Sequence, residues 1–144
     1  AGMGEAEYTR LTHDLTLAAA RALAKARPGA TFCYVSGEGT DLSSRSMWAR
    51  VKGRTETALL QLSLEAYMFR PGFIRPRRGK QSKTALYRIG YLLLSPAFPL
   101  LRRLAPRHVT TAENVGLAMV AVAERGYDHR VLENVDINGL GSGT

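Results

Sequence analysis

The sequence contains few residues that form covalent cross-links or bind metal ions. Among its 144 residues there are one cysteine and three histidines. A single cysteine excludes an internal disulfide framework and a cysteine-based zinc site. Cys33 lies within an apolar run, where a thiol usually serves as a small buried hydrophobe. Because the histidines show no His-x-x-x-His or carboxylate–histidine spacing, we expect no metal site. A reducing, cytoplasmic setting fits this composition.

Long apolar runs are also missing. The longest extends from Ile89 to Leu101 and is interrupted by Pro96 and Pro99. A membrane-spanning helix needs roughly 20 apolar residues, so we expect no transmembrane span. The start of the chain is acidic and polar, which is not typical of a secretion signal. With 45% apolar and 22% charged residues, the composition is that of one globular domain with a core of its own.

Acidic residues are absent between Ala66 and Ala112. That window holds ten basic residues, whereas the rest of the chain holds ten basic and twelve acidic ones. The ten are Arg70, Arg75, Arg77, Arg78, Lys80, Lys83, Arg88, Arg102, Arg103 and Arg107. Such a local positive charge favours an anionic partner, either a phosphorylated small molecule, nucleic acid or an acidic membrane surface. The basic loop at 75–83 lacks the aromatic side chains or helix that would read bases, which argues against nucleic acid.

Apolar periodicity predicts alternating helices and strands. The expected helices cover 5–27, 47–62 (with Ser46 as N-cap), 83–94 and a segment from Thr110 or Thr111 to Gly126; the expected strands cover 30–36, 65–69 and 131–137. This order predicts an α/β fold with a parallel sheet. Such sheets bind ligands at the carboxyl ends of their strands, which places a candidate site in the loops at 36–41 and 70–76.

We expect one domain over residues 1–138, with a basic and apolar insertion at about 75–108 and a flexible tail at 139–144. Four segments in a fixed order then carry a resemblance to a known family. They are Tyr34-Val35-Ser36-Gly37, Trp48-x-x-x-Lys52, Phe69-Arg70-Pro71-Gly72 and Val109-Thr110-Thr111-Ala112-Glu113-Asn114-Val115-Gly116-Leu117-Ala118. Together they resemble the C-terminal half of NAD(P)-dependent epimerase/dehydratase-like proteins, an atypical branch of the short-chain dehydrogenases. The resemblance extends from the first helix to about Asn138.

The resemblance implies a partial Rossmann-like, doubly wound parallel sheet, with NAD or NADP as cofactor and a nucleotide-sugar-like substrate. In that family, a lysine contacts the cofactor ribose and lowers the pKa of a catalytic tyrosine four residues earlier. Lys52 matches the lysine, but Trp48 stands at the tyrosine position, and an indole N–H cannot shuttle a proton. The serine that orients substrate would fall at Ser36 or Gly37. Tyr34 is a replacement for the tyrosine only if its ring faces the loop.

The resemblance also implies that Arg70, Pro71 and Gly72 lie beside the nicotinamide and the substrate. Each of these assignments has an ordinary structural alternative. Lys52 would otherwise be a solvated helix lysine and Trp48 a core residue, and Arg70 would pair with Glu65 or a backbone carbonyl. Glu56 is interpreted as an ordinary exposed charge on the second helix.

The chain lacks the Gly-x-Gly-x-x-Gly turn with which the family binds the cofactor pyrophosphate. We therefore expect it to be the C-terminal portion of a longer protein. A sheet without its first strands would have an open edge, which favours a homo-oligomer. Two further functions stay open. One is a non-catalytic dinucleotide-binding or redox-sensing module. The other is a peripheral membrane or nucleic-acid contact through residues 66–112.

Overall fold

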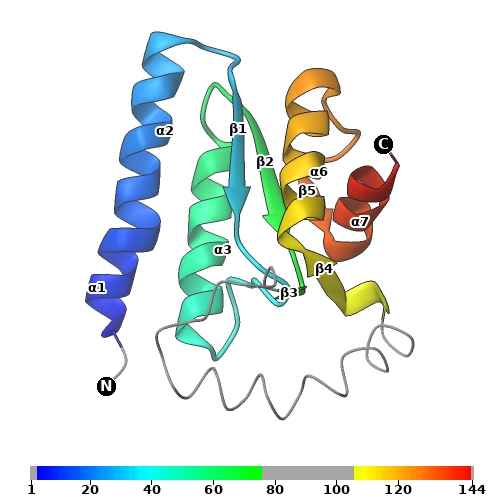
Figure 1. Ribbon diagram of the computed structural model, residues 1–144. Helices are drawn as coiled ribbons and strands as arrows, with labels where there is room; N and C mark the ends of the chain where they lie inside the picture. Colours follow the sequence, from blue (N-terminus) through cyan, green and yellow to red (C-terminus); the bar gives the residue numbers. More distant parts are fainter. Residues whose placement is uncertain (1–2, 76–105, 144) are drawn as a thin grey trace.

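A three-stranded parallel sheet lies between two layers of helices (Figure 1). The computed structural model describes residues 3–75 and 106–143. In chain order its elements are α1 (Glu5–Thr9), the π-helical turn η1 (Arg10–Asp14), α2 (Leu15–Ala26), β1 (Thr31–Val35), α3 (Met47–Leu60), β2 (Glu65–Arg70), β3 (Phe73–Arg75), the 3-10 turn η2 (Pro106–His108), β4 (Val109–Thr111), α6 (Ala112–Arg125), β5 (Val131–Glu133) and α7 (Asn134–Ser142). The predicted α/β fold with a parallel sheet is confirmed.

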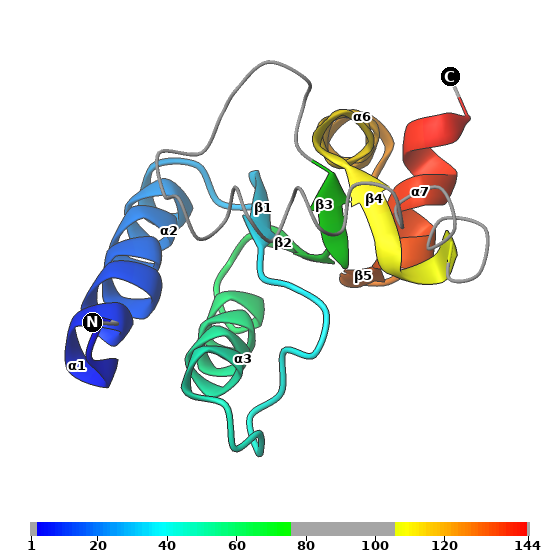
Figure 2. The same cartoon turned by 60° about the horizontal axis from the view of Figure 1, so that its bottom comes forward.

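The strand order is β1-β2-β5, and both pairings are parallel. Thr31 pairs with Glu65 at one end of the sheet, and Arg70 pairs with Glu133 at the other. All three strands therefore end at the same edge, which lies at the bottom of Figure 1 and comes forward in Figure 2. A second, two-stranded parallel sheet, β3-β4, lies beside this edge.

The central strand β2 divides the core into two halves. Its alternate side chains point to opposite faces of the sheet. Ala66 and Met68 pack with Leu17, Ala20 and Leu59 of α2 and α3. Tyr67 and Phe69 pack on the other face with residues of α6, β5 and α7, namely Val115, Ala118, Val122, Leu132 and Ile137. Burial on both faces explains why β2 is a continuous apolar run that stops at Arg70.

Most of the predicted helices are confirmed with small shifts at their ends. The first extends from Glu5 to Ala26, with an unpredicted π-helical turn inside it. α3 begins at Met47 as expected but ends at Leu60, and the Ser46 side chain makes no capping hydrogen bond. At α6 the predicted cap is formed, since the Thr111 hydroxyl accepts from the Asn114 amide at 3.0 Å. The helix predicted at 83–94 and the insertion at 76–105 lie outside the described residues.

The expectation of a strand at 131–137 followed by a flexible tail is wrong from residue 134 onwards. β5 ends at Glu133, and α7 then continues to Ser142. A capping box starts this helix, because the carboxylates of Glu133 and Asp136 each accept from a backbone amide of its first turn. Gly141 lets α7 approach α6 closely, since a Cβ there would lie 2.6 Å from the Asn114 Cα. Within 3–75 and 106–143, no helix is long and apolar enough to cross a membrane.

Candidate functional site

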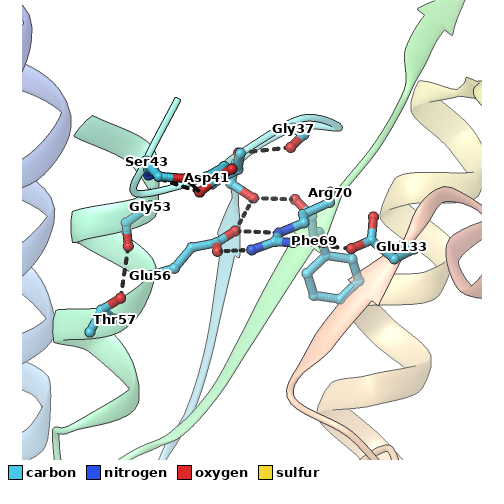
Figure 3. Close-up of polar contacts among 11 residues, drawn as sticks. Gly37, Asp41, Ser43, Gly53, Glu56, Thr57, Phe69, Arg70 and Glu133 are labelled. Carbon is cyan, nitrogen blue, oxygen red and sulfur yellow. Dashed lines mark hydrogen bonds and ion pairs between the residues drawn. The ribbon is translucent and has the colours of Figure 1, made fainter. Parts of the chain in front are cut away.

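Three charged or polar residues end the three strands of the main sheet at one edge. Ser36 follows β1, Arg70 is the last residue of β2, and Glu133 is the last of β5. The helix α3 lies beside this edge and contributes Lys52 and Glu56, which are one turn apart and share a helix face. Figure 3 shows Glu56 reaching from α3 toward Arg70, with Glu133 on the far side of the guanidinium.

Glu56 is the centre of this cluster, although it was expected to be exposed. Glu56 is only 4% exposed. The Ser36 hydroxyl donates to Glu56 Oε1 at 2.5 Å. Arg70 donates to both carboxylate oxygens, from Nε to Oε1 at 3.0 Å and from NH2 to Oε2 at 2.5 Å. The interpretation of Glu56 as an exposed charge is therefore wrong, because a bidentate arginine pair and a hydroxyl compensate its burial.

Arg70 forms ion pairs at both ends of its guanidinium group. Besides the two bonds to Glu56, NH1 donates to Glu133 Oε1 at 3.1 Å. The hydrogen bonds that Arg70 donates to Glu56 are the main reason why the pKa of Arg70 is raised. The alternative that Arg70 pairs with Glu65 is wrong, since Glu65 forms its ion pair with Arg130. Arg70 thus lies at the predicted edge, but its donors are already used by carboxylates.

Lys52 and Ser36, which were predicted to share a site, are in direct contact. The Lys52 ammonium donates to the backbone carbonyl oxygen of Ser36. Burial lowers the pKa of Lys52, and the negative charge of Glu56 partly opposes this. The Ser36 hydroxyl is buried, donates to Glu56 and lies 3.2 Å from the Phe69 carbonyl oxygen. In this arrangement it is directed into the cluster, and its role in orienting a substrate stays a prediction.

Trp48 lies at the edge of this site rather than in the core. It precedes Lys52 by one turn of α3 and is 40% exposed. Its ring packs over the loop that follows β1: a Cβ at Gly37 would lie 3.8 Å from Cζ3, and one at Gly39 would lie 3.9 Å from Cη2. Gly39 has φ +80°, a conformation that favours glycine. Trp48 is therefore not a core residue, and its role as an aromatic that lines a site stays a prediction.

Tyr34 does not meet the condition set for a replacement of the catalytic tyrosine. Its ring is partly buried and packs against the core cluster formed by β2, α2 and α3. Its hydroxyl is buried and has no hydrogen-bond partner among the described residues. The nearby Thr55 hydroxyl donates instead to the Val51 carbonyl at 2.8 Å. Loss of hydration on burial raises the pKa of Tyr34 to about 12. Tyr34 is therefore a core residue, and the suggestion that it replaces the tyrosine is wrong.

The turn Pro71-Gly72 is fixed between the loop after β1 and the start of α7. The Glu38 amide donates to the Pro71 carbonyl at 2.9 Å, and the Gly72 amide donates to Asn134 Oδ1 at 2.8 Å. A side chain at Gly72 would collide with the His108 carbonyl oxygen and the Glu38 carboxylate. Pro71 and Gly72 thus lie at the same edge as Ser36, and their predicted contact with a cofactor stays a prediction.

Two residues that were not predicted to belong to a site organise this edge. Glu56 could have been found from spacing, because it continues the row of Trp48 and Lys52 at every fourth residue of α3. Asn134 is 3% exposed and ties three segments together. It accepts from Gly72 and donates to the carbonyls of Arg107 and Val109, at 2.9 and 3.2 Å. Nothing in the sequence pattern distinguishes Asn134 from the other residues of the strand expected at 131–137.

The site lacks the ligands of a metal centre. Across residues 3–75 and 106–143, no group of three or more His, Cys, Asp or Glu side chains could hold a metal ion. The sequence matches no model of a known protein family and no curated protein.

Proposed function

We propose that this chain belongs to an NAD(P)-dependent epimerase- or oxidoreductase-like protein in which Lys52 contacts the ribose of the cofactor. The observation that carries the proposal is the position of the Lys52 ammonium. It lies at the carboxyl edge of a parallel sheet, one turn after Trp48 and against the Ser36 carbonyl. Parallel α/β sheets bind nucleotides at this edge. A partial Rossmann-like arrangement of the strands is part of the same proposal.

The residues at this edge have the chemistry that a dinucleotide requires. Lys52 has three N–H donors, and its bond to Ser36 uses one of them. The other two suit the hydroxyls of a ribose. The exposed ring of Trp48 offers a flat apolar surface next to them. A bound cofactor would supply hydride transfer. Arg70 is less suited to a direct contact, because Glu56 and Glu133 already accept from its guanidinium.

A second candidate function is a non-catalytic dinucleotide-binding or redox-sensing module. The specific observation behind it is the lack of a suitable acid/base group. Trp48 stands where the family has its tyrosine, the Tyr34 ring packs against the core with its hydroxyl buried, and the Ser36 hydroxyl is directed toward Glu56. With this arrangement the site would hold a cofactor without turning it over. The nucleotide-sugar-like substrate follows from the resemblance alone.

Cofactor binding can be tested on the full-length natural protein by titrating it with NADH and NADPH while following cofactor fluorescence. We expect saturable binding of at least one of them. Replacement of Lys52 by methionine should weaken that binding about tenfold or more, because it removes donors to the ribose. The matched control is Lys25→Met, which removes the same charge from the exposed side of α2.

Binding without any hydride transfer to or from the cofactor would favour the non-catalytic module, whereas measured transfer would exclude it. If neither dinucleotide binds the wild-type protein, or if Lys52→Met and Lys25→Met have equal effects, the proposed function is wrong.

A further inference from the structure

Glu56 is a buried charge that the proposed function does not use. Its carboxylate accepts three hydrogen bonds from two strands that it does not belong to, one from Ser36 after β1 and two from Arg70 at the end of β2. These contacts cross the sheet edge, as Figure 3 shows for Glu56 and Arg70. A carboxylate that is only 4% exposed has a large unfavourable free energy unless such partners are present. The charge of Glu56 is therefore stabilised by these protein donors rather than by water.

Ser36 connects Glu56 to Lys52. The serine hydroxyl donates to Glu56, and the carbonyl oxygen of the same serine accepts from the Lys52 ammonium. Lys52 and Glu56 are also one turn apart on α3. Ser36, which follows β1, is thus bound to α3 through both its hydroxyl and its carbonyl oxygen. The contacts then continue from Glu56 through Arg70 to Glu133 at the end of β5.

We propose that Glu56 is a positioning residue of the Lys52 site: it holds Ser36 and Arg70 at the strand ends, and its carboxylate, one helical turn from Lys52, favours the positive charge of the ammonium group there. The contribution of Glu56 to cofactor binding rests on the proposed function, but the effect of Glu56 on Lys52 does not. In support, burial lowers the pKa of Lys52 and the charge of Glu56 opposes that change. Without Glu56, the lysine would keep its burial and the nearby Arg70 would lose its main carboxylate partner.

The other charged groups at this edge have partners of their own. Glu133 pairs with Arg70, Glu38 forms an ion pair with His108, and Asp41 accepts from the Ser43 amide and hydroxyl. Hydrogen bonds from Ser43 hold the pKa of Asp41 below its usual value. Arg70 is a further cation at this edge, and it donates to the carboxylates of both Glu56 and Glu133. A change in Glu56 should therefore affect Lys52 more than a change in any of the others.

The test is the pKa of the Lys52 amine, measured by NMR from the pH dependence of its ¹³Cε signal. This sequence has four lysines, and the Lys52 signal is assigned by its absence from a Lys52→Arg variant. We expect Glu56→Gln to lower the pKa of Lys52 measurably. Glu133→Gln is the matched control, because it makes the same change in the other carboxylate that accepts from Arg70, and it should leave the pKa of Lys52 near its wild-type value. An unchanged Lys52 pKa in Glu56→Gln, or equal shifts in both variants, would overturn the inference.

A second measurement needs no variant, which protects the test if Glu56→Gln does not fold. In the wild-type protein, protonation of the Glu56 carboxyl can be followed by its own ¹³C signal. We expect a step in the Lys52 ¹³Cε signal at the same midpoint. A Lys52 signal that does not respond to this titration contradicts the inference.

Cofactor titrations separate this inference from the proposed function. If both hold, Glu56→Gln weakens dinucleotide binding about tenfold near neutral pH, as expected when one charge-assisted contact is lost. If the wild-type protein binds neither NADH nor NADPH but Glu56→Gln still lowers the Lys52 pKa, the proposed function fails and the role of Glu56 toward Lys52 stands. If a dinucleotide binds the wild-type protein but Glu56→Gln leaves the Lys52 pKa unchanged, the proposed function stands and the role of Glu56 toward Lys52 is wrong.

Discussion

At the scale of single residues, the geometry of the candidate site is determined by the ion pairs that its charged side chains form. Lys52 and Ser36 could be predicted to share a site, because the order of the motifs puts both at the carboxyl end of the sheet. Spacing places Glu56 in the same row of α3 as Lys52 but does not predict its burial, since a glutamate on an amphipathic helix is exposed in most proteins. Its burial is decided by Arg70, a residue of another element, and sequence spacing carries no information about that contact.

Stability should depend much more on Glu56 than on Glu133. Glu56→Gln replaces a buried carboxylate that accepts from both Arg70 and Ser36, so we expect it to reduce the free energy of unfolding by about 2–4 kcal/mol. Glu133 is half exposed in its pair with Arg70. Glu133→Gln should therefore cost less than about 1 kcal/mol. Urea unfolding of the two variants at neutral pH makes the comparison, and equal losses would show that Glu56 is not the organising charge.

Tyr34 should titrate separately from an ordinary tyrosine. Its pKa is raised to about 12, whereas the unfolded value is about 10. The folded state thus holds this proton more tightly between those values. The contribution of this proton to the free energy of unfolding is fully present below about pH 10 and is lost as the pH rises through about 12. In Tyr34→Phe this loss of stability with pH should be smaller.

The measurement is an absorbance titration of the six tyrosines at alkaline pH, in parallel with urea unfolding. Tyr34→Phe should remove the component near pH 12, and at neutral pH it should be neutral or stabilising by up to about 1 kcal/mol, because the hydroxyl has no partner. Loss of a component near pH 10 instead would contradict the assignment of Tyr34 to the core.

At the scale of elements, long periodic segments were predicted well and short ones were not. The helices at 5–26, 47–60 and 112–125 have a continuous apolar face, and each agrees with its prediction within about two residues at its ends. β3 and β4 have three residues each, too few to establish a period of two. α7 contains Gly139 and Gly141, which have low helix propensity, so tertiary contacts and its capping box decide its conformation.

The two glycines of α7 offer a matched pair of substitutions. A Cβ at Gly141 would lie 2.6 Å from the Cα of Asn114 in α6, whereas one at Gly139 would have nothing within 4 Å. We expect Gly141→Ala to cost about 1–3 kcal/mol, because the two helices must separate. Gly139→Ala should be neutral or stabilising by up to about 1 kcal/mol, since alanine favours the helix. Similar costs in urea unfolding would mean that α6 and α7 do not pack this closely.

At the scale of the whole molecule, the alternation of elements was sufficient to predict a parallel α/β sheet. The position of the site followed from it, because every strand of such a sheet ends at the same edge. The function did not follow, because it depends on single substitutions within a shared architecture. Under the proposed relationship to the short-chain dehydrogenases, Trp48 stands at the tyrosine position and removes the expected proton donor, while Lys52 keeps the lysine position. The basic segment at 66–112 lies mostly outside the described residues, so a membrane or nucleic-acid contact through it stays a prediction.

The proposed function requires that a dinucleotide binds to Lys52 at this edge. The most direct measurement is the ¹³Cε NMR signal of Lys52 in the full-length natural protein as NADH or NADPH is added, with the exposed Lys25 as an internal control. We predict a saturable shift of the Lys52 signal and no change at Lys25. A Lys52 signal that stays in place at saturating concentrations of both cofactors would contradict the claim.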